Sequence, residues 1–364
     1  MKKRTIAITL AFMLMIPTAV FANLPNLTIQ EATTRAVNNS RGIRNTQDSI
    51  TLLEEGEQRI REIIWDTPVM PTATFIEMQA NMMRLDANRA VSLSSITAQR
   101  ETLGFIVTNH FANITMAQNE LALFEESLLL LERDVASVRL MQNLGMASHA
   151  QLDQLLASQR QAENNRVNLE LSLDAAFREL NRIMGSRQNE RYHLVFEPHF
   201  QSVSALNLTH YIQLHQNNSL QIEQAQNQLR IARFEHDNHA VPFNPITSEV
   251  IVGGPTRNER AVAVTQANRE VTNAREQVEN NVIDLHNNIR NLEIAIESMQ
   301  LQLGILEQSL AISQLQYSVG HLTAIELNRA KLSLAELQEN IRRQQVNHHL
   351  MVMQLTNPNI ALGF

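Results

Sequence analysis

The chain begins its first repeated segment with Leu27-Thr-Ile-Gln-Glu and continues, a few residues later, with Asn38-Asn-Ser. The same pattern returns without a gap as Leu206-Asn-Leu-Thr-His followed by Asn217-Asn-Ser. Self-similarity at a long, fixed period outranks any local motif in predicting a fold. The sequence therefore predicts two copies of one structural unit, packed as a pseudo-symmetric pair.

The far ends of the two copies correspond as well. Gly145 and Ser148 in the first copy match Gly320 and Thr323 in the second. Glycine suits the left-handed position that closes a helix, and Ser or Thr suits the N-cap of the helix that follows. Each copy is therefore predicted to contain two antiparallel helices joined by a turn at the glycine.

Long stretches without proline predict unusually long helices. No proline occurs between Pro71 and Pro198 or between Pro255 and Pro358, and proline is the residue that most strongly interrupts a helix. Apolar residues alternate steps of three and four within these stretches, as in a coiled-coil seam. The seam residues are Leu121, Phe124, Leu128, Leu131, Val135 and Val138 in the first half, and Val282, Leu285, Ile289, Leu292, Ile296, Met299, Leu303, Leu306 and Leu310 in the second.

The expected helices follow from these signals. One runs from about Asn258 to Ser318, which at about 1.5 Å per residue makes it roughly 90 Å long. The helices after the glycine turns run from Gln151 to Met184 and from Ala324 to about Leu355.

The first residues resemble a signal peptide. Lys2, Lys3 and Arg4 precede an apolar run over 6–20, and a cleavage site of small residues ends at Ala22. The alternative is a membrane anchor, but the run is short for a span of about 20 residues. The predicted organisation is a signal peptide at 1–22, a first repeat at 23–185, a linker at 186–204, a second repeat at 205–358 and a flexible tail at 359–364.

Composition excludes several classes of function. The chain has no cysteine, so it forms no disulfide and no thiolate metal site. A net charge of -7 without a basic stripe predicts no nucleic-acid partner. The twelve histidines, including His236, His239 and the pair His348-His349, lack a zinc-binding spacing and are interpreted as solvated surface residues. We therefore predict no catalytic residue, cofactor or metal, and no enzyme.

The plan resembles that of the TolC-like outer-membrane efflux family over most of residues 27–358. The resemblance is carried by the duplicated Leu-Thr-Ile-Gln-Glu-Ala and Asn-Asn-Ser signature, and by Tyr317-Ser-Val-Gly followed by Thr323 and Leu327. It implies a homotrimer whose helices form a hollow periplasmic α-barrel, capped by a β-barrel in the outer membrane. It also implies docking of the hairpin tips onto a periplasmic adaptor (membrane fusion) protein and an inner-membrane pump, contact with outer-membrane lipid, and no covalent chemistry.

The resemblance also implies an aperture near the hairpin tips. Carried over by position, its candidate residues are Tyr317, Gly320, Thr323, Glu326, Gly145 and Ser148. Three positions depart from the family pattern: Leu322 replaces a basic residue, and Arg329 and Gln151 replace acids. The alternative for Glu326 is an exposed (i, i+3) pair with Arg329 on a helix.

The strands that the family places between its helices are short or missing here. In the second half, Ile246–Val252 and Ala261–Gln266 could pair around Gly253-Gly254-Pro255, whereas Trp65–Gly104 shows no strand pair. The stretch Phe75–Leu85 reads as helix by residue preference. The predicted fold is thus mainly α: duplicated, long antiparallel coiled-coil hairpins that form part of a trimeric α-barrel, with a reduced or absent β-barrel portion.

Two functional hypotheses follow. The first is an exported outer-membrane and periplasmic channel component of a tripartite efflux or type I secretion system, acting as a passive conduit for drugs, ions or proteins. The second is a coiled-coil envelope protein without a barrel, periplasmic or extracellular, with a structural or binding role. The adaptor partner itself would need β-rich segments beside its hairpin, and the sequence has none.

Overall fold

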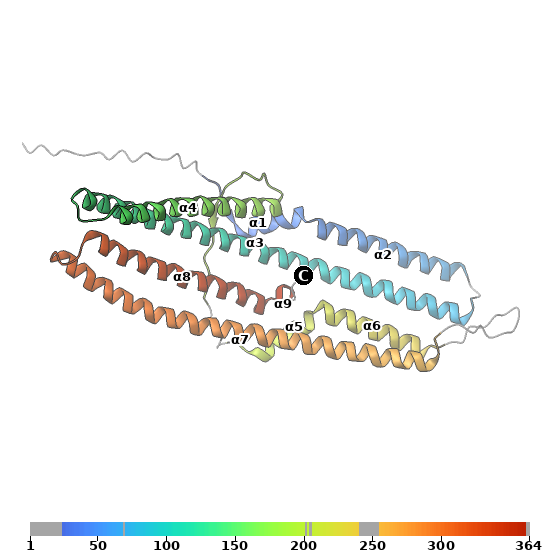
Figure 1. Cartoon of the computed structure of the whole chain (residues 1–364). Helices are drawn as coiled ribbons and strands as arrows, with labels where there is room; N and C mark the ends of the chain where they lie inside the picture. Colours follow the sequence, from blue (N-terminus) through green and yellow to red (C-terminus); the bar gives the residue numbers. More distant parts are fainter. Residues whose placement is uncertain (1–23, 68–69, 201, 204–205, 240–254, 362–364) are drawn as a thin grey trace, which may run out of the picture.

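The computed structural model describes residues 24–67, 70–200, 202–203, 206–239 and 255–361, and shows an elongated bundle of helices (Figure 1). The predicted signal peptide and the strand at Ile246–Val252 lie outside the described residues. The helices are α1 (Ile29–Asn39), α2 (Arg41–Asp66), α3 (Thr72–Asn143), α4 (His149–Met184), α5 (Leu208–Asn218), α6 (Leu220–Asp237), α7 (Arg257–Ser318), α8 (Ala324–Thr356) and α9 (Pro358–Ala361). None of these described helices is long and apolar enough to cross a membrane.

The duplicated opening signature is a pair of helix caps. In the first copy, the hydroxyl of Thr28 accepts a hydrogen bond from the backbone N–H of Glu31 and starts α1. Asn207 starts α5 in the same way. The serines of the two Asn-Asn-Ser motifs, Ser40 and Ser219, then cap α2 and α6. Each cap satisfies a backbone donor that has no partner within its helix. The repeated residues therefore start new helices at equivalent places in the two copies.

The two long antiparallel hairpins are those predicted. They are formed by α3 with α4 and by α7 with α8, and α7 has 62 residues, which at about 1.5 Å per residue makes it roughly 90 Å long. Leu128, Val135, Val282, Ile289 and Ile296 of the predicted seams are buried. In each half the two shorter helices pack on the other end of the long one: α1 and α2 on α3, and α5 and α6 on α7 (Figure 1).

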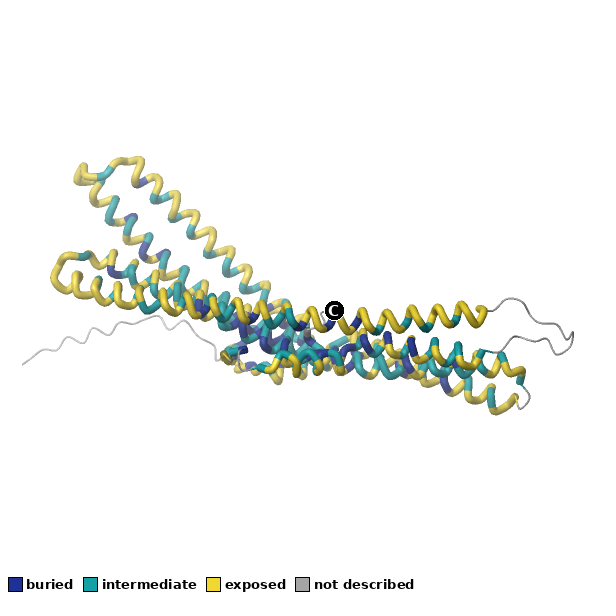
Figure 2. The backbone as a smooth tube through the Cα atoms, turned by 90° about the horizontal axis from the view of Figure 1, so that it is seen from below, coloured by how far each residue is buried: buried dark blue, intermediate teal, exposed yellow. Residues whose placement is uncertain are grey.

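The main core lies near the middle of the rod, where Figure 2 shows the buried residues gathered. Phe111 of α3 and Leu180 of α4 are fully buried there. Two short strands, β1 (Asn26–Thr28) and β2 (His193–Val195), pair in parallel beside them. Tyr192 and Phe196 flank β2 and belong to the same core. The predicted linker at 186–204 therefore contains a strand and contributes to the core.

Two histidines contradict the prediction of solvated surface residues. His215 and His348 are fully buried. His215 Nε2 lies 2.8 Å from the carbonyl oxygen of Leu355, and burial lowers the pKa of this imidazole. His348 Nε2 lies 3.1 Å from Glu293 Oε1, and its ring stacks on Phe200. Both are covered by packing between the end of α8 and segments far away in the sequence, which no local pattern reveals.

The predicted return strand Ala261–Gln266 is wrong, because these residues lie within α7. Thr256 and Glu259 form a capping box that starts α7 ahead of this segment. In the first half the absence of a strand pair is confirmed: residues 67–71 alone join α2 to α3, and Phe75–Leu85 is helical. Among the described residues, β1 and β2 are the only strands.

The flexible tail predicted after Pro358 is also wrong for its described part. Residues Pro358–Ala361 form the short helix α9. The side chain of Ile360 is buried, and Asn359 Nδ2 donates to Glu101 Oε2 of α3 at 2.6 Å. Helix α9 is therefore packed between α3 of the first half and α5 and α8 of the second.

Truncating the central core should destabilise the protein strongly. We expect Leu180→Ala to lower the free energy of unfolding by about 2–5 kcal/mol, because it leaves a cavity beside Phe111. Leu93→Ala, at a half-exposed position of α3, should change it by no more than about 0.5 kcal/mol. Urea unfolding followed by circular dichroism measures both, and equal losses would contradict the assigned core.

Candidate contact site at the hairpin tips

The two hairpins end in turns of the same geometry. Gly145 and Gly320 have φ angles of 73° and 79°, which glycine adopts without strain. In the first turn, the N–H of Met146 donates to the carbonyl of Met141 at 2.8 Å. In the second, the N–H of His321 donates to that of Gln316 at 2.8 Å. These are Schellman closures, in which the glycine lets the chain leave one helix while satisfying its last carbonyls.

The next helix starts through a capping box in both turns. The N–H of Gln151 donates to Ser148 Oγ, and the Ser148 N–H donates to Gln151 Oε1 at 2.9 Å. In the second turn, Thr323 and Glu326 form the same pair of bonds, with Thr323 N–H to Glu326 Oε2 at 2.8 Å. The glycine and the Ser or Thr three residues later thus have the turn and cap roles that the sequence predicts. Their role in an aperture stays a prediction.

Glu326 is engaged in this cap. Its carboxylate accepts hydrogen bonds from the backbone N–H and the hydroxyl of Thr323. These bonds, the backbone one first, lower the pKa of Glu326 below its ordinary value of 4.5. Arg329 pairs with Asp134 of α3 rather than with Glu326, so the alternative of an (i, i+3) ion pair is wrong. The structure therefore gives Glu326 a structural role that sequence reasoning missed.

Three polar contacts join α3 to α8 and so connect the two hairpins. Besides Asp134 with Arg329, Glu120 pairs with Arg343 at 3.1 Å, and Asn119 Nδ2 donates to Glu339 at 3.2 Å. Sequence reasoning missed these contacts, because their partners lie far apart in the chain and each looks like an ordinary solvated helix residue. They fix which face of the first hairpin meets the second.

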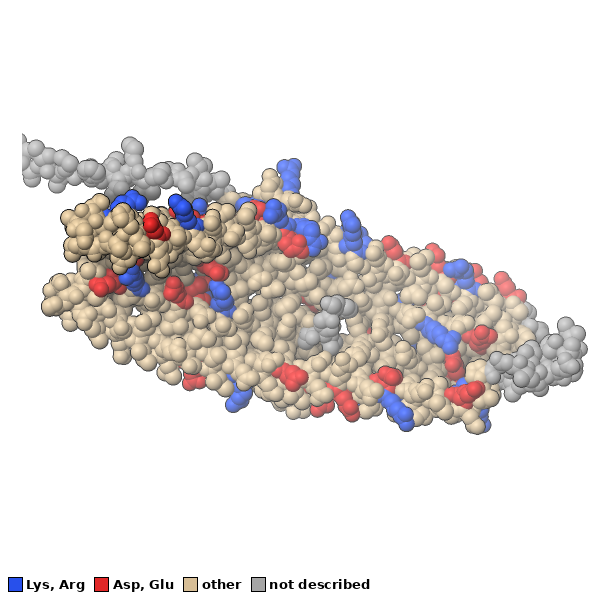
Figure 3. Space-filling view, viewed as in Figure 1, with Lys and Arg blue, Asp and Glu red and all other residues tan. Residues whose placement is uncertain are grey.

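The tips present apolar, uncharged surfaces. No Asp, Glu, Lys or Arg occurs between Arg139 and Asp153 or between Glu307 and Glu326, and Figure 3 shows few charged side chains at the outer end of the α7–α8 hairpin. The large exposed apolar side chains at the tips are Leu140, Met141, Leu144, Met146, Ile312, Leu315 and Val319, and Tyr317 is 46% exposed among them. Such surfaces suit contact with another protein.

The chemistry of these ends is that of a contact surface. Among the described residues, no three His, Asp or Glu side chains are grouped so that they could hold a metal ion. Near the second tip, Glu326 is engaged in a helix cap and Arg329 in an ion pair with Asp134.

Comparison by sequence gives no assignment, since no protein-family model and no curated protein matches this chain. Comparison of structures shows a similarity of fold. A membrane protein from Pseudomonas aeruginosa is 14% identical, with a TM-score of 0.66 over 92% of each chain. CusC, described in connection with transmembrane channel formation, is 14% identical with a TM-score of 0.65 over 91% of each chain. The CmeC outer-membrane channel of Campylobacter jejuni is 11% identical with a TM-score of 0.60, over 92% of this chain and 85% of CmeC.

This chain therefore has the fold of outer-membrane channels, and the predicted TolC-like resemblance is confirmed as a likeness of fold. The similar structures are described as membrane proteins and channels, not as enzymes. At these levels of identity the likeness concerns the arrangement of the helices.

The turn glycines should not tolerate a Cβ atom. We expect Gly320→Ala to destabilise the protein by about 1–2 kcal/mol, the cost of a left-handed conformation for an L-residue. Gly304→Ala, in the interior of α7 with no atom of another segment within 4 Å of the added carbon, should instead stabilise it by up to about 1 kcal/mol. Urea unfolding of the pair measures both signs, and a stabilising Gly320→Ala would contradict the assigned turn.

The first turn of α8 should weaken in acid, whereas that of α4 should not. Because folding lowers the pKa of Glu326, its stabilising contribution is complete above pH 4.5 and is lost as the pH falls through the lowered value. The matched position in α4 is the neutral Gln151. Amide hydrogen-exchange protection in the two turns, measured between pH 6 and 3, should diverge, and Glu326→Gln should abolish the difference. Parallel loss in both turns would contradict this role.

Proposed function

We propose that this protein is an exported channel component of a tripartite efflux or type I secretion system. It would act as a passive conduit for drugs, ions or proteins, with its rod in the periplasm and its other end at the outer membrane. The fold it shares with outer-membrane channels supports this function. The observation that supports it most strongly is the exposed apolar surface of α7.

Helix α7 is apolar on two opposite faces. One face is the seam that packs inside the chain, with Ile296 buried and Leu303 half-buried. The other consists of exposed residues, many of them two positions away from a seam residue and hence about 200° around the helix. This exposed stripe contains Ile294 (57% exposed), Leu301 (70%), Ile305 (69%), Ile312 (59%), Leu315 (66%) and Val319 (59%).

We expect a stripe of this size to be buried against another protein surface, because leaving each large aliphatic side chain exposed to water costs about 1.5–3 kcal/mol. Complementary surfaces exist on the first hairpin of the same chain. Leu129 and Leu140 are exposed on α3, and Val167 and Leu171 on α4. Contact between the α7 stripe of one copy and the first hairpin of the next is head-to-tail, and such contacts form a closed ring when the rotation between copies closes. We infer that the ring is a homotrimer, as the TolC-like resemblance implies.

The two ends of the rod would then have different partners. The apolar, uncharged tips at Gly145 and Gly320 would contact a periplasmic adaptor that leads to an inner-membrane pump. Tyr317, Thr323 and Ser148 would belong to this contact end. Residues 1–22 would direct export and be removed. Transport would be driven by the pump, since the proposal assigns no catalytic residue, cofactor or metal to this chain.

A coiled-coil envelope protein without a pore is the second candidate. The observation that favours it is the connection between α2 and α3, which spans residues 67–71 alone. Such a protein would use the same hairpins for binding or for support of the envelope. It would not need the α7 stripe to close a ring of copies, so the assembly state separates the two candidates.

Charges on the stripe should break the assembly without unfolding the subunit. We expect the purified protein to sediment as a trimer and the double variant Leu301→Asp/Ile305→Asp to sediment as a monomer with unchanged helical circular dichroism. Gln302→Asp, at an exposed position off the stripe, is the matched control and should remain trimeric. A monomeric wild-type protein, or a trimeric double variant, would contradict the conduit.

A further inference from the structure

The first hairpin tip, where α3 turns into α4, carries two exposed methionines. Met146 is 75% exposed and Met141 is 44% exposed. Every other methionine among the described residues is buried or half-buried, and Met184 in the core is only 4% exposed. The soft thioether sulfur of methionine is open to oxidants wherever they can reach it. Among the described residues, the most accessible sulfur atoms are therefore gathered in a single turn.

Backbone hydrogen bonds place Met141 and Met146 at the two ends of this turn. The N–H of Met146 donates to the carbonyl of Met141 at 2.8 Å, and the N–H of Gly145 donates to that of Gln142 at 2.9 Å. In this Schellman closure the residues at the first and last positions commonly make an apolar contact across the turn. The methionine pair thus belongs both to the closure of the turn and to its exposed surface.

The second tip has polar residues at the same two positions. There the N–H of His321 donates to the carbonyl of Gln316 at 2.8 Å, which makes these residues the equivalents of Met146 and Met141. No methionine or cysteine occurs between Glu307 and Glu326. Oxidation of sulfur can therefore alter the first tip and leaves the second unchanged.

Hydrogen peroxide converts a methionine thioether into a sulfoxide in one step. A lone pair of the sulfur attacks one peroxide oxygen, so that an S–O bond forms as the O–O bond breaks. The proton on the transferred oxygen passes to the departing hydroxide, which leaves as water. Sulfur loses two electrons and the peroxide gains them. The product is polar, and methionine sulfoxide reductases return it to the thioether.

The surface of the first tip depends strongly on this pair. Its large exposed apolar side chains are Leu140, Met141, Leu144 and Met146. No charged residue occurs between Arg139 and Asp153, so a contact made by this tip must rely on the burial of apolar side chains. Two sulfoxides would make half of these four side chains polar.

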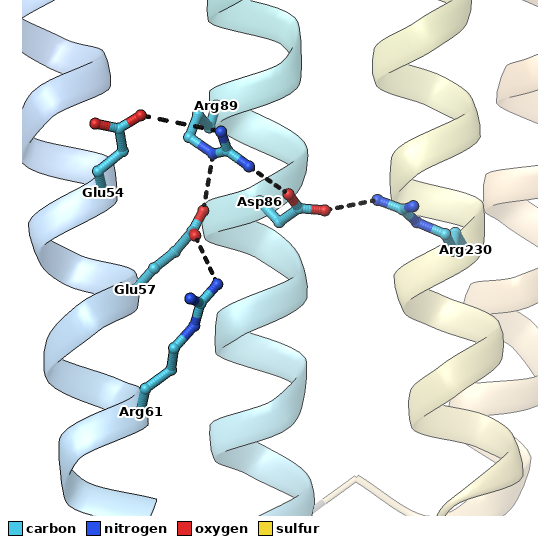
Figure 4. Close-up of polar contacts among 6 residues, drawn as sticks. All are labelled: Glu54, Glu57, Arg61, Asp86, Arg89 and Arg230. Atoms are coloured by element: carbon cyan, nitrogen blue, oxygen red, sulfur yellow. Dashed lines mark hydrogen bonds and ion pairs between the residues drawn. The ribbon is translucent and has the colours of Figure 1, made fainter.

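The opposite end of the rod is joined by contacts of another kind (Figure 4). Arg89 of α3 contacts Glu57 of α2 at 3.2 Å, and Asp86 of α3 pairs with Arg230 of α6 at 4.0 Å. Met83 of α3 is half-buried, one turn before Asp86. The carboxylates and guanidinium groups of these ion pairs contain no sulfur, so methionine oxidation leaves the contacts between these helices in place.

We propose that the first hairpin tip is a reversible oxidation site, at which peroxide converts Met141 and Met146 into methionine sulfoxide and weakens the contact of this tip with its partner protein. This rests on the proposed function, in which the tips contact a periplasmic adaptor. The second tip keeps its contact, so oxidation acts on one of the two hairpins of each chain.

Peptide mass spectrometry tests the site without any partner. The purified mature protein is treated with hydrogen peroxide, and the oxidation of each methionine is followed over time. We expect Met141 and Met146 to be oxidised several-fold faster than Met184, and methionine sulfoxide reductases to restore both. Equal rates at the three positions would overturn the site.

Crosslinking in the producing cell tests the effect on the contact. A photo-crosslinking amino acid is placed at Leu144 of the first tip or at Val319 of the second. Peroxide should lower the yield of crosslinks from position 144 several-fold and leave the yield from position 319 unchanged. In the control variant Met141→Leu/Met146→Leu the yield from position 144 should not respond, because leucine is apolar, has a similar volume and contains no sulfur.

The possible failures are distinguishable. Unchanged crosslinks from position 144, despite sulfoxides at Met141 and Met146, would overturn the effect on the contact and leave the conduit intact. An equal fall at both tips, or a fall in the leucine variant, would place the sensitive group elsewhere and overturn it as well. An absence of crosslinks from both tips before peroxide treatment would contradict the proposed tip contact itself, whereas the mass spectrometry still decides the oxidation site.

Discussion

A single helix cannot bury its own apolar seam, and this constraint determines how the whole molecule is arranged. The apolar seam of α7 runs from Val282 to Leu310, with Ala274 and Val278 also buried ahead of it, so it needs a long partner that runs beside it. An antiparallel neighbour reached through a short turn is the cheapest such partner, because little chain entropy is lost in closing a short loop. The closures at Gly145 and Gly320 provide that neighbour in both halves. The lengths of these helices set the distance between the hairpin tips and the opposite end of the molecule.

The same constraint bears on the proposed assembly of copies. A helix that packs on one side only is usually polar on the other, yet α7 carries Ile294, Leu301 and Ile305 opposite its seam. Such a helix is suited to the inside of a larger assembly, with one partner from its own chain and one from a neighbour. The internal contacts between α3 and α8 turn both hairpins of one chain into a unit. A ring of copies would then repeat two kinds of hairpin contact, one within chains and one between them.

What the sequence could predict was local or periodic. The turns were predictable because the glycine, the N-cap residue and its capping-box partner lie within a few residues of one another, as from Gly320 to Glu326. The seams were predictable because their period repeats many times. The strand expected at Ala261–Gln266 failed because a short alternating run is ambiguous, whereas the Thr256 cap directly starts a helix there. His215 and His348 were misjudged because burial depends on segments that approach from elsewhere in the chain. The same non-locality hid the pair of Asp134 with Arg329.

The two halves have kept their helices and diverged in what joins them. Equivalent caps at Ser40 and Ser219 and equivalent turns show that the scaffold of each copy is held by the same local bonds. The connections at the other end differ, with residues 67–71 in one half and 238–256 in the other. Helix lengths are constrained by seams that must match along their whole length, whereas a connector at the end of a rod is free of that restriction. The connectors can therefore differ between the two halves while the helical scaffold stays the same.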